Sequence, residues 1–154
     1  REKMMMSREY ANIGGNCFWP ANELLKNTGG IAEELQASYY RYPALIPAYS
    51  RMNPGEPVEV QSLTLKKVEG AYLLEWKSDA NIRNPSSAHY YVIYRVPDGS
   101  PMDLTRPENI VGTTRQTSFR IPFRDGKRQY LYGVTTVNRY HNESPKGVWK
   151  RVKP

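Results

Sequence analysis

The sequence predicts a mainly β protein, a seven-stranded β-sandwich preceded by an α/β fragment. Three observations support this prediction. From residue 58 onward, apolar and polar side chains alternate with a period of two. Before residue 43, apolar residues recur at helical spacing, and residues 43–57 between the two parts hold four prolines, too many for a helix or a central strand. We expect the fragment over residues 1–50, a Pro-rich linker over 51–59 and the sandwich over 60–154.

The first part predicts helices and one strand. Residues 1–11 favour a helix that the glycines at 14 and 15 end. A short apolar strand is expected at 15–19, followed by a short helical or irregular turn over 21–30. A second helix is expected over 31–42, because Ile31, Leu35, Tyr39 and Tyr42 have helical spacing, and it stops before Pro43.

The second part predicts seven strands separated by turn residues, a number typical of a β-sandwich. They are expected at 58–68, 70–78, 89–96, 108–114, 117–123, 128–138 and 147–153. Alternation places two sets of residues on single strand faces: Tyr72, Leu74 and Trp76 in the second strand, and Tyr130, Tyr132, Val134 and Thr136 in the sixth. The third strand is apolar on both faces, so its phase stays open.

Charge and composition limit the function classes. The net charge is +7 over 154 residues. The excess lies in residues 51–154, with seventeen basic and ten acidic side chains, where it is scattered except in the terminal "KGVWKRVKP"; lysines in a last strand are typical of edge protection. No apolar run approaches the ~18 residues of a membrane span. Residues 1–10 lack a signal-peptide pattern and begin on arginine, which indicates a piece of a longer protein.

Residue types that carry metal or nucleophilic chemistry are sparse. Cys17 has apolar neighbours, which favour an inert core thiol. His89 and His141 lack metal-ligand spacing, and the chain has no phosphate-binding glycine loop, nucleophile elbow or zinc signature. We therefore expect neither a metal nor a cofactor. Residues 142–144, "NES", match the glycosylation acceptor pattern but indicate only a turn if the source is bacterial.

The second part resembles a fibronectin type III module. The similarity rests on "YLLEW" at 72–76, "YVIYR" at 91–95 and above all "YLYGVTTVNRYHNESP" at 130–145. Residues 97–115 depart from the family into a longer connection. The resemblance implies that Tyr91 and Ile93 point inward, and that Tyr130 is the tyrosine-corner residue whose hydroxyl binds upstream backbone.

The first part resembles the end of the barrel in the glycosyl-hydrolase-like family 10 proteins. The similarity rests on "REYANIGGNCFWPANELL" at 8–25 and "LQASYYRYPALIP" at 35–47. It implies the last strand and helices of a (β/α)8 barrel whose remainder lies upstream in the same protein. It also implies a glycan substrate, such as peptidoglycan or another polysaccharide, and a periplasmic or outer-membrane lipoprotein of the bacterial cell envelope, anchored through an N-terminus outside this chain.

The resemblance places three residues at the carboxyl-terminal face of that barrel, where barrel active sites lie. Trp19 could stack on a sugar ring, Asn22 could bond its hydroxyls, and Glu23 is a weak candidate for a catalytic carboxylate. Glycoside hydrolysis needs two carboxyl groups, so this chain alone is not expected to be catalytic. Each residue also has a structural alternative: Trp19 packs under a rim, Asn22 satisfies turn backbone, and Glu23 caps or solvates a helix.

Three functions therefore stay open. The first is the carboxyl-terminal part of a glycan-cleaving protein with an accessory sandwich. The second is a non-catalytic carbohydrate- or protein-binding module, which requires an exposed row of aromatics, with Tyr90, Tyr94 and Trp149 as candidates. The third, a nucleic-acid binder, is disfavoured because no strand carries the mixed aromatic and basic motif of RNA-binding sheets.

Overall fold

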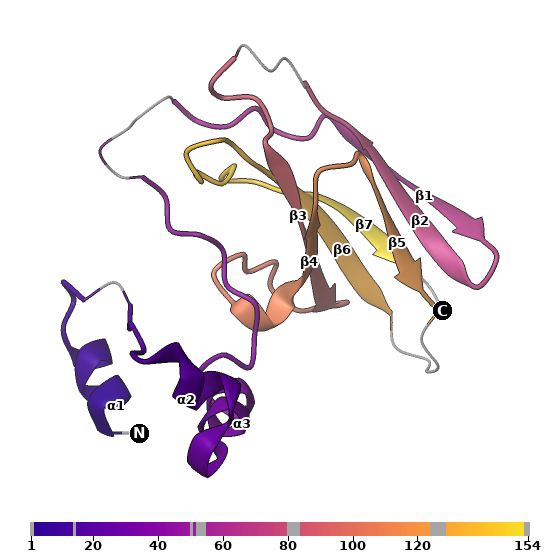
Figure 1. The fold of residues 1–154 in the computed structure, drawn as a ribbon. Coiled ribbons are helices and arrows are strands. Elements are labelled where there is room, and N and C mark those ends of the chain that lie inside the picture. The colour runs from indigo at the N-terminus through magenta and orange to yellow at the C-terminus, as the bar shows by residue number, and fades with distance from the viewer. Residues whose placement is uncertain are drawn as a thin grey trace. The chain divides into compact units, whose positions relative to one another are not determined.

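The computed structural model describes residues 2–13, 15–49, 51, 55–79, 84–123 and 129–152 (Figure 1). Some predicted positions lie outside these residues, namely Gly14, residues 52–54 of the linker, Arg128 and Lys153. The chain forms two compact units, Arg1–Arg41 and Tyr42–Pro154. This division precedes the boundary expected at residue 50, because part of the Pro-rich segment packs on the sandwich.

The first unit consists of short helices. They are α1 (Glu2–Glu9), α2 (Ala21–Leu25), the 3-10 turn η1 (Thr28–Gly30) and α3 (Ile31–Ala37). Asn27 has a left-handed backbone (φ 51°), and its Oδ1 accepts hydrogen bonds from the N–H groups of Ala32 (2.8 Å) and Glu33 (3.3 Å). These bonds satisfy two of the unpaired N–H groups at the start of α3. The helix ends at Ala37, earlier than the 31–42 expected.

The strand expected at residues 15–19 is wrong. Residues 15–18 have no regular secondary structure, and the described residues of the first unit contain no other strand with which they could pair. A lone strand would leave its backbone groups to water, so an apolar run alone does not make one. Cys17 is exposed, so the prediction of a core thiol is also wrong.

The second unit is the predicted seven-stranded sandwich of two antiparallel sheets. The three-stranded sheet has the order β1-β2-β5, formed by Ser62–Val68, Ala71–Lys77 and Ser118–Pro122. The four-stranded sheet has the order β4-β3-β6-β7, formed by Ile110–Thr114, Tyr90–Pro97, Tyr130–Val137 and Val148–Val152. Every pairing is antiparallel, and a 3-10 turn, η2 (Pro107–Asn109), precedes β4.

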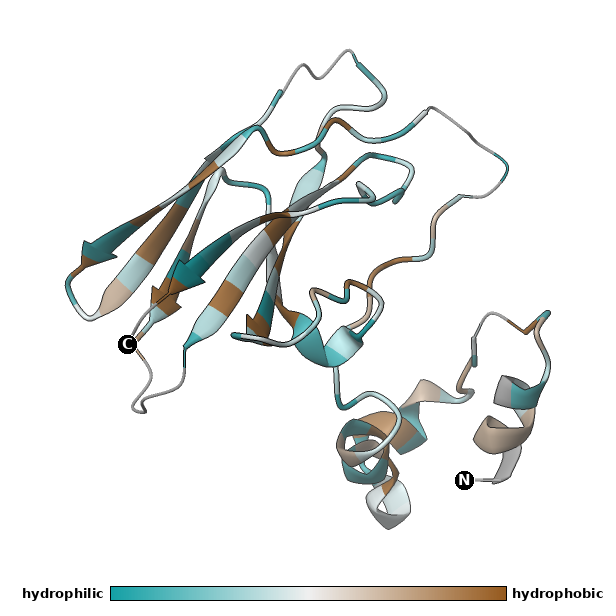
Figure 2. Cartoon of the chain, turned by 180° about the vertical axis from the view of Figure 1, so that it is seen from behind, coloured by the Kyte–Doolittle hydropathy of each residue, from teal (hydrophilic) through white to brown (hydrophobic). Residues whose placement is uncertain are grey.

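The main core lies between the two sheets and confirms the predicted strand faces. Alternating residues of both sheets fill it: Leu63, Leu74, Trp76, Tyr91, Ile93, Ile121, Tyr132, Val134 and Val152, with Val60. The alternation of apolar and polar residues along the strands is visible in Figure 2. The Trp76 and Tyr91 rings meet edge to face with centroids 5.1 Å apart, across the gap between the sheets. Tyr91 and Ile93 point inward, as the family resemblance implied.

Residues 124–128, directly upstream of Tyr130, lie outside the described residues, so the tyrosine-corner role implied for Tyr130 stays a prediction. Its ring lies under the guanidinium of Arg95, with Cζ 4.9 Å from the ring centroid. Tyr130 therefore contributes a cation–π contact between β3 and β6.

Gly133 in β6 generates the first prediction, because it lies under the indole of its β7 partner, Trp149. A Cβ atom added at Gly133 would be 2.6 Å from Cδ2 of Trp149. We expect Gly133→Ala to lower the free energy of unfolding by about 1–3 kcal/mol through overpacking, measured by urea denaturation. In a Trp149→Leu background the same change should cost much less; an equal cost in both backgrounds would contradict the contact as the cause.

Candidate functional site

The four-stranded sheet is apolar on its outer face as well as on its inner one. Val92, Tyr94 and Val137 are buried there and form a second cluster, separate from the core between the sheets. Leu45, Tyr90, Leu104, Ile110 and Trp149 pack against this outer-face cluster. Strand β3 is therefore buried on both sides, which settles the phase that its sequence left open.

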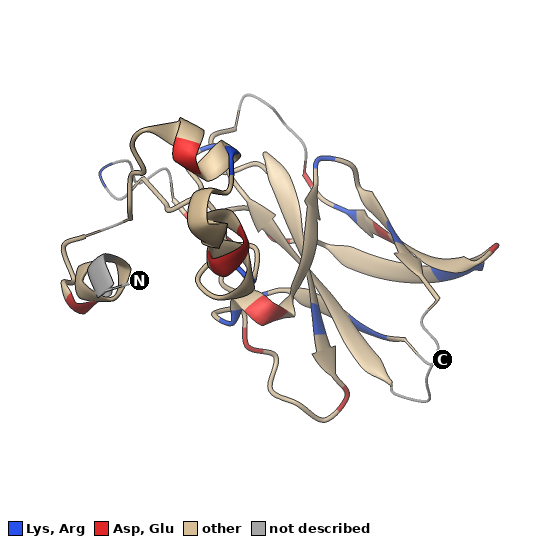
Figure 3. Ribbon diagram, turned by 60° about the horizontal axis from the view of Figure 1, so that its bottom comes forward, with Lys and Arg blue, Asp and Glu red and all other residues tan. Residues whose placement is uncertain are grey.

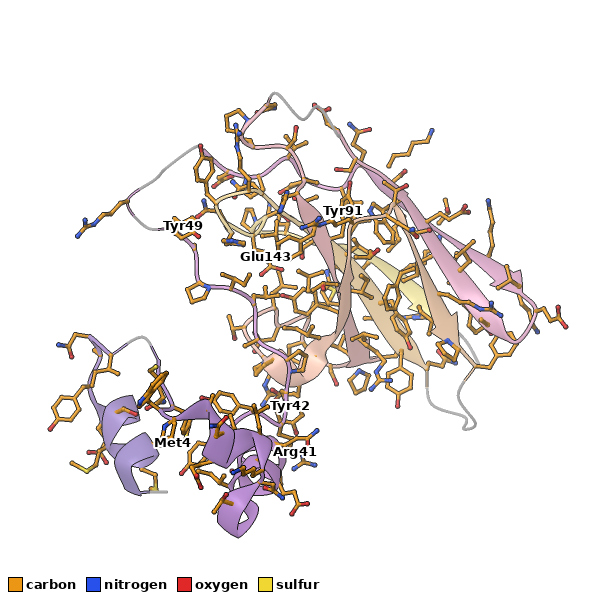
Figure 4. The ribbon with its side chains drawn as sticks, in the orientation of Figure 1. Met4, Arg41, Tyr42, Tyr49, Tyr91 and Glu143 are labelled. Atoms are coloured by element: carbon orange, nitrogen blue, oxygen red, sulfur yellow. The ribbon has the colours of Figure 1, made fainter. Side chains whose placement is uncertain are left out.

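A Pro-rich strap, defined here as residues 43–49, covers part of this outer face. Leu45 of the strap packs against the outer-face cluster. The backbone N–H of Tyr49 donates to the carbonyl of Tyr140 (3.0 Å), and the Tyr49 ring meets the His141 ring edge to face at 5.4 Å. Figure 4 shows Tyr49 on this segment, beside the turn that carries Glu143. The strap thus belongs to the sandwich unit.

Glu143 binds the hydroxyl of Tyr94, which is buried in the outer-face cluster. Its Oε1 accepts hydrogen bonds from the Tyr94 hydroxyl (2.8 Å) and from Thr135 Oγ1. Burial raises the pKa of Tyr94 far above its usual value of 10.0, and the hydrogen bond to Glu143 raises it further. Burial and the Glu143 charge also raise the pKa of Tyr90. Both phenols therefore stay protonated, and Tyr94 remains a hydrogen-bond donor.

The strap and the sheet border an open pocket of about 400 Å³. Four separate segments line it: residues 44–46 of the strap, His89 and Tyr90 at the start of β3, residues 113–115 at the end of β4, and His141 after β6. This volume lies within the roughly 300–1,000 Å³ of small-molecule sites. Sequence reasoning missed the pocket, because its lining residues are far apart in the sequence and share no motif.

The residues that the barrel resemblance proposed lie together in the first unit. Trp19 is 90% exposed and directly precedes the Pro20 N-cap of α2, while Asn22 and Glu23 are exposed in the first turn of that helix. All three lie within one short stretch of the chain. Their roles as substrate contacts and as a weak catalytic candidate stay predictions.

The prediction of an exposed row of aromatics, which a binding module requires, is wrong for Tyr94, the central residue of that row. Tyr94 is fully buried at 0% exposure, and Tyr90 and Trp149 are partly buried beside it. The three do share one face of the sheet, as their spacing suggested. The apolar strap and the connection before β4 cover that face, so the tyrosines pack instead of meeting solvent.

The described Lys and Arg residues of the sandwich lie on several strands and turns (Figure 3). Over the described parts of the chain, no three His, Cys, Asp or Glu residues are arranged to hold a metal ion. No helix within those parts is both long and apolar enough to cross a membrane.

The strand order and the two antiparallel sheets define a fibronectin type III-like β-sandwich, here joined to a small helical unit. No protein-family model matches the chain. The sequence is 25% identical over 142 residues to the glycosyl hydrolase YngK of Bacillus subtilis (strain 168). That match covers 92% of this chain, and so both units, but only 28% of the length of YngK.

Comparison with solved structures finds similar sandwich domains. Titin kinase with its flanking domains matches 63% of this chain and 17% of its own at 18% identity (TM-score 0.49). The protein FN3tt matches 62% of this chain and 94% of its own at 17% identity (TM-score 0.46). The spore cortex lytic enzyme SleM of Clostridium perfringens matches 62% of this chain and 27% of its own at 10% identity (TM-score 0.45).

The raised pKa of Tyr94 predicts a specific loss of stability in alkali. Below pH 10 the phenol is protonated in both the folded and the unfolded chain. Above pH 10 the unfolded chain loses this proton while the folded one keeps it, so the free energy of unfolding falls as the pH rises. Tyr94→Phe should make this decline shallower, by up to about 1.4 kcal/mol per pH unit.

The measurement is urea denaturation from pH 7 to pH 12. At pH 7, Tyr94→Phe should cost about 1 kcal/mol, because Glu143 loses a partly buried donor. Tyr40→Phe removes an exposed hydroxyl in the other unit and is the matched control. Identical pH profiles for the wild-type chain and Tyr94→Phe would contradict the assignment.

Proposed function

We propose that this chain is the carboxyl-terminal part of a glycoside-hydrolase-like protein that acts on a glycan, with the sandwich as its accessory module. The observation that carries the proposal is the relationship to the glycosyl hydrolase YngK, which extends through both the helical unit and the sandwich. A similarity confined to the sandwich would have supported only a common β module.

The first unit supports the proposal physically, because it buries very little. Met4 and Leu35 are its only buried apolar side chains among the described residues. Large apolar side chains lie exposed on it: Met5, Met6, Tyr10, Ile13, Trp19, Leu25, Ile31 and Tyr40. Apart from Trp19, which we assign to the glycan site, these side chains form a surface typical of one that meets a partner, and the partner we propose is the remainder of a (β/α)8 barrel in the same protein.

In that barrel, the residues around α2 would line the glycan site. Trp19 offers an apolar ring for a sugar face, Asn22 offers an amide for sugar hydroxyls, and Glu23 is the weak candidate for one carboxylate. Hydrolysis needs a second carboxyl group roughly 5–10 Å away, which we place elsewhere in the barrel. We propose a bacterial cell envelope location and peptidoglycan or another envelope polysaccharide as substrate.

The test compares the 154-residue chain with the longest natural polypeptide that contains it. Each is incubated with purified peptidoglycan and with a panel of insoluble polysaccharides, and newly formed reducing ends are measured. We expect release by the longer polypeptide and none by the 154-residue chain. Failure of the longer polypeptide on every substrate, or the absence of a barrel from it, would overturn the proposal.

Trp19 gives a sharper prediction in the same assay. In the longer polypeptide, Trp19→Ala should lower kcat/KM by about tenfold or more, because a stacking contact with the glycan is lost; each tenfold corresponds to about 1.4 kcal/mol. Phe123→Ala removes an exposed aromatic from the sandwich and is the matched control. Equal kcat/KM for both variants and the wild-type protein would remove Trp19 from the site.

A further inference from the structure

The pocket under the strap joins an apolar wall to a polar rim. Ala44, Leu45 and Ile46 of the strap line it together with the half-buried Tyr90, and two imidazoles, two threonines and Arg115 complete the lining. Pyranose rings have an apolar C–H face and a polar edge of hydroxyls. A pocket with one aromatic wall and several convergent polar groups matches both surfaces of such a ring.

The imidazole of His141, one of the polar groups of the rim, is held in place by the turn that carries it. Nδ1 of His141 is buried without a hydrogen-bond partner in the described part of the chain. The turn holds His141 in a left-handed conformation (φ 63°), which is uncommon for a residue with a side chain. Asn138 fixes this turn, because its Oδ1 accepts from the N–H groups of Tyr140 and Asn142 (3.0 Å each). The imidazole is therefore positioned before any ligand arrives.

The charge of the lining selects an anionic ligand. Arg115 is exposed at the pocket, and the described residues give its guanidinium neither an ion pair nor a hydrogen bond. No acidic side chain lines the pocket. Glu143, whose charge acts on Tyr90, is not among the lining residues and accepts its hydrogen bonds from Tyr94 and Thr135. A planar guanidinium can bind a carboxylate through two parallel hydrogen bonds.

We propose that the pocket formed by the strap, Tyr90, Arg115 and His141 binds a carboxylate-bearing saccharide, with the sugar ring against Tyr90 and the carboxylate at Arg115. The two imidazoles and the Thr113 hydroxyl then bond the sugar hydroxyls. That such a saccharide is a segment of the substrate rests on the proposed function. The binding itself rests only on the lining of the pocket.

Two disaccharides that differ in one carboxylate test the proposal on the 154-residue chain. The probes are N-acetylglucosaminyl-N-acetylmuramic acid and the neutral N,N′-diacetylchitobiose, each titrated into 15N-labelled protein and followed by NMR. We expect the anionic probe to bind about tenfold more tightly and to shift the amide signals of His89, Tyr90 and His141. No binding of either probe, or equal affinity for both, would overturn the proposal.

Charge-matched variants separate a specific contact from general attraction to a basic protein. Arg115→Gln should remove the preference for the anionic probe, lowering its affinity about tenfold. Arg106→Gln, an exposed arginine paired with Glu108 before β4, reduces the net charge equally and should leave the preference intact. Equal losses in the two variants would show net-charge attraction only and would refute the site.

The result of the disaccharide titration does not depend on the result of the hydrolysis assay. Binding by the 154-residue chain without hydrolysis by the longer polypeptide would overturn the proposed function and leave the pocket assignment intact. Hydrolysis without binding to the 154-residue chain would do the reverse.

Discussion

The second unit depends on the need to cover both faces of its four-stranded sheet. In an ordinary sandwich one face of each sheet is packed and the other meets water. Here Val92 and Tyr94 of β3 and Val137 of β6 are fully buried on the outer face. The hydrophobic effect favours covering such a surface by about 25 cal/mol per Å² of apolar area. Segments outside the strands therefore pack on this face, and the strap is one of them.

The polar features of that face follow from the same requirement. A tyrosine hydroxyl buried in an apolar cluster is costly unless it is hydrogen-bonded, and Glu143 supplies the acceptor for Tyr94. Trp149 can cover the sheet only because its cross-strand neighbour, Gly133, has no side chain. The pocket lies between the strap and the end of β4. Its apolar wall comes from the strap, which covers part of the sheet. Its polar rim comes from residues at the ends of β3 and β4 and in the turn after β6.

Sequence patterns predicted the elements whose signal is local. Period-two alternation placed Leu74 and Val134 in the core, because a strand face repeats every second residue. The same reasoning failed at Cys17, since an apolar run does not reveal whether a neighbouring strand exists. It failed at Tyr94, since exposure depends on a strap far away in the sequence. The pocket could not be found at all, because its lining comes from four distant segments, although an apolar Leu45 inside a Pro-rich segment was a usable signal.

The two units differ in a way that constrains how they work. The sandwich buries two apolar clusters and satisfies its own outer face. The helical unit buries only Met4 and Leu35 among its described residues, whereas ordering a backbone costs on the order of 1–2 kcal/mol per residue. A chain of about 40 residues or fewer rarely folds without a disulfide, a metal ion or a partner subunit. This balance supports our proposal that further residues of the same protein pack on the helical unit. Because the similarity to YngK covers 92% of this chain, we propose that the exposed apolar side chains around Trp19 contact the rest of a larger domain, while Trp19 itself faces the glycan.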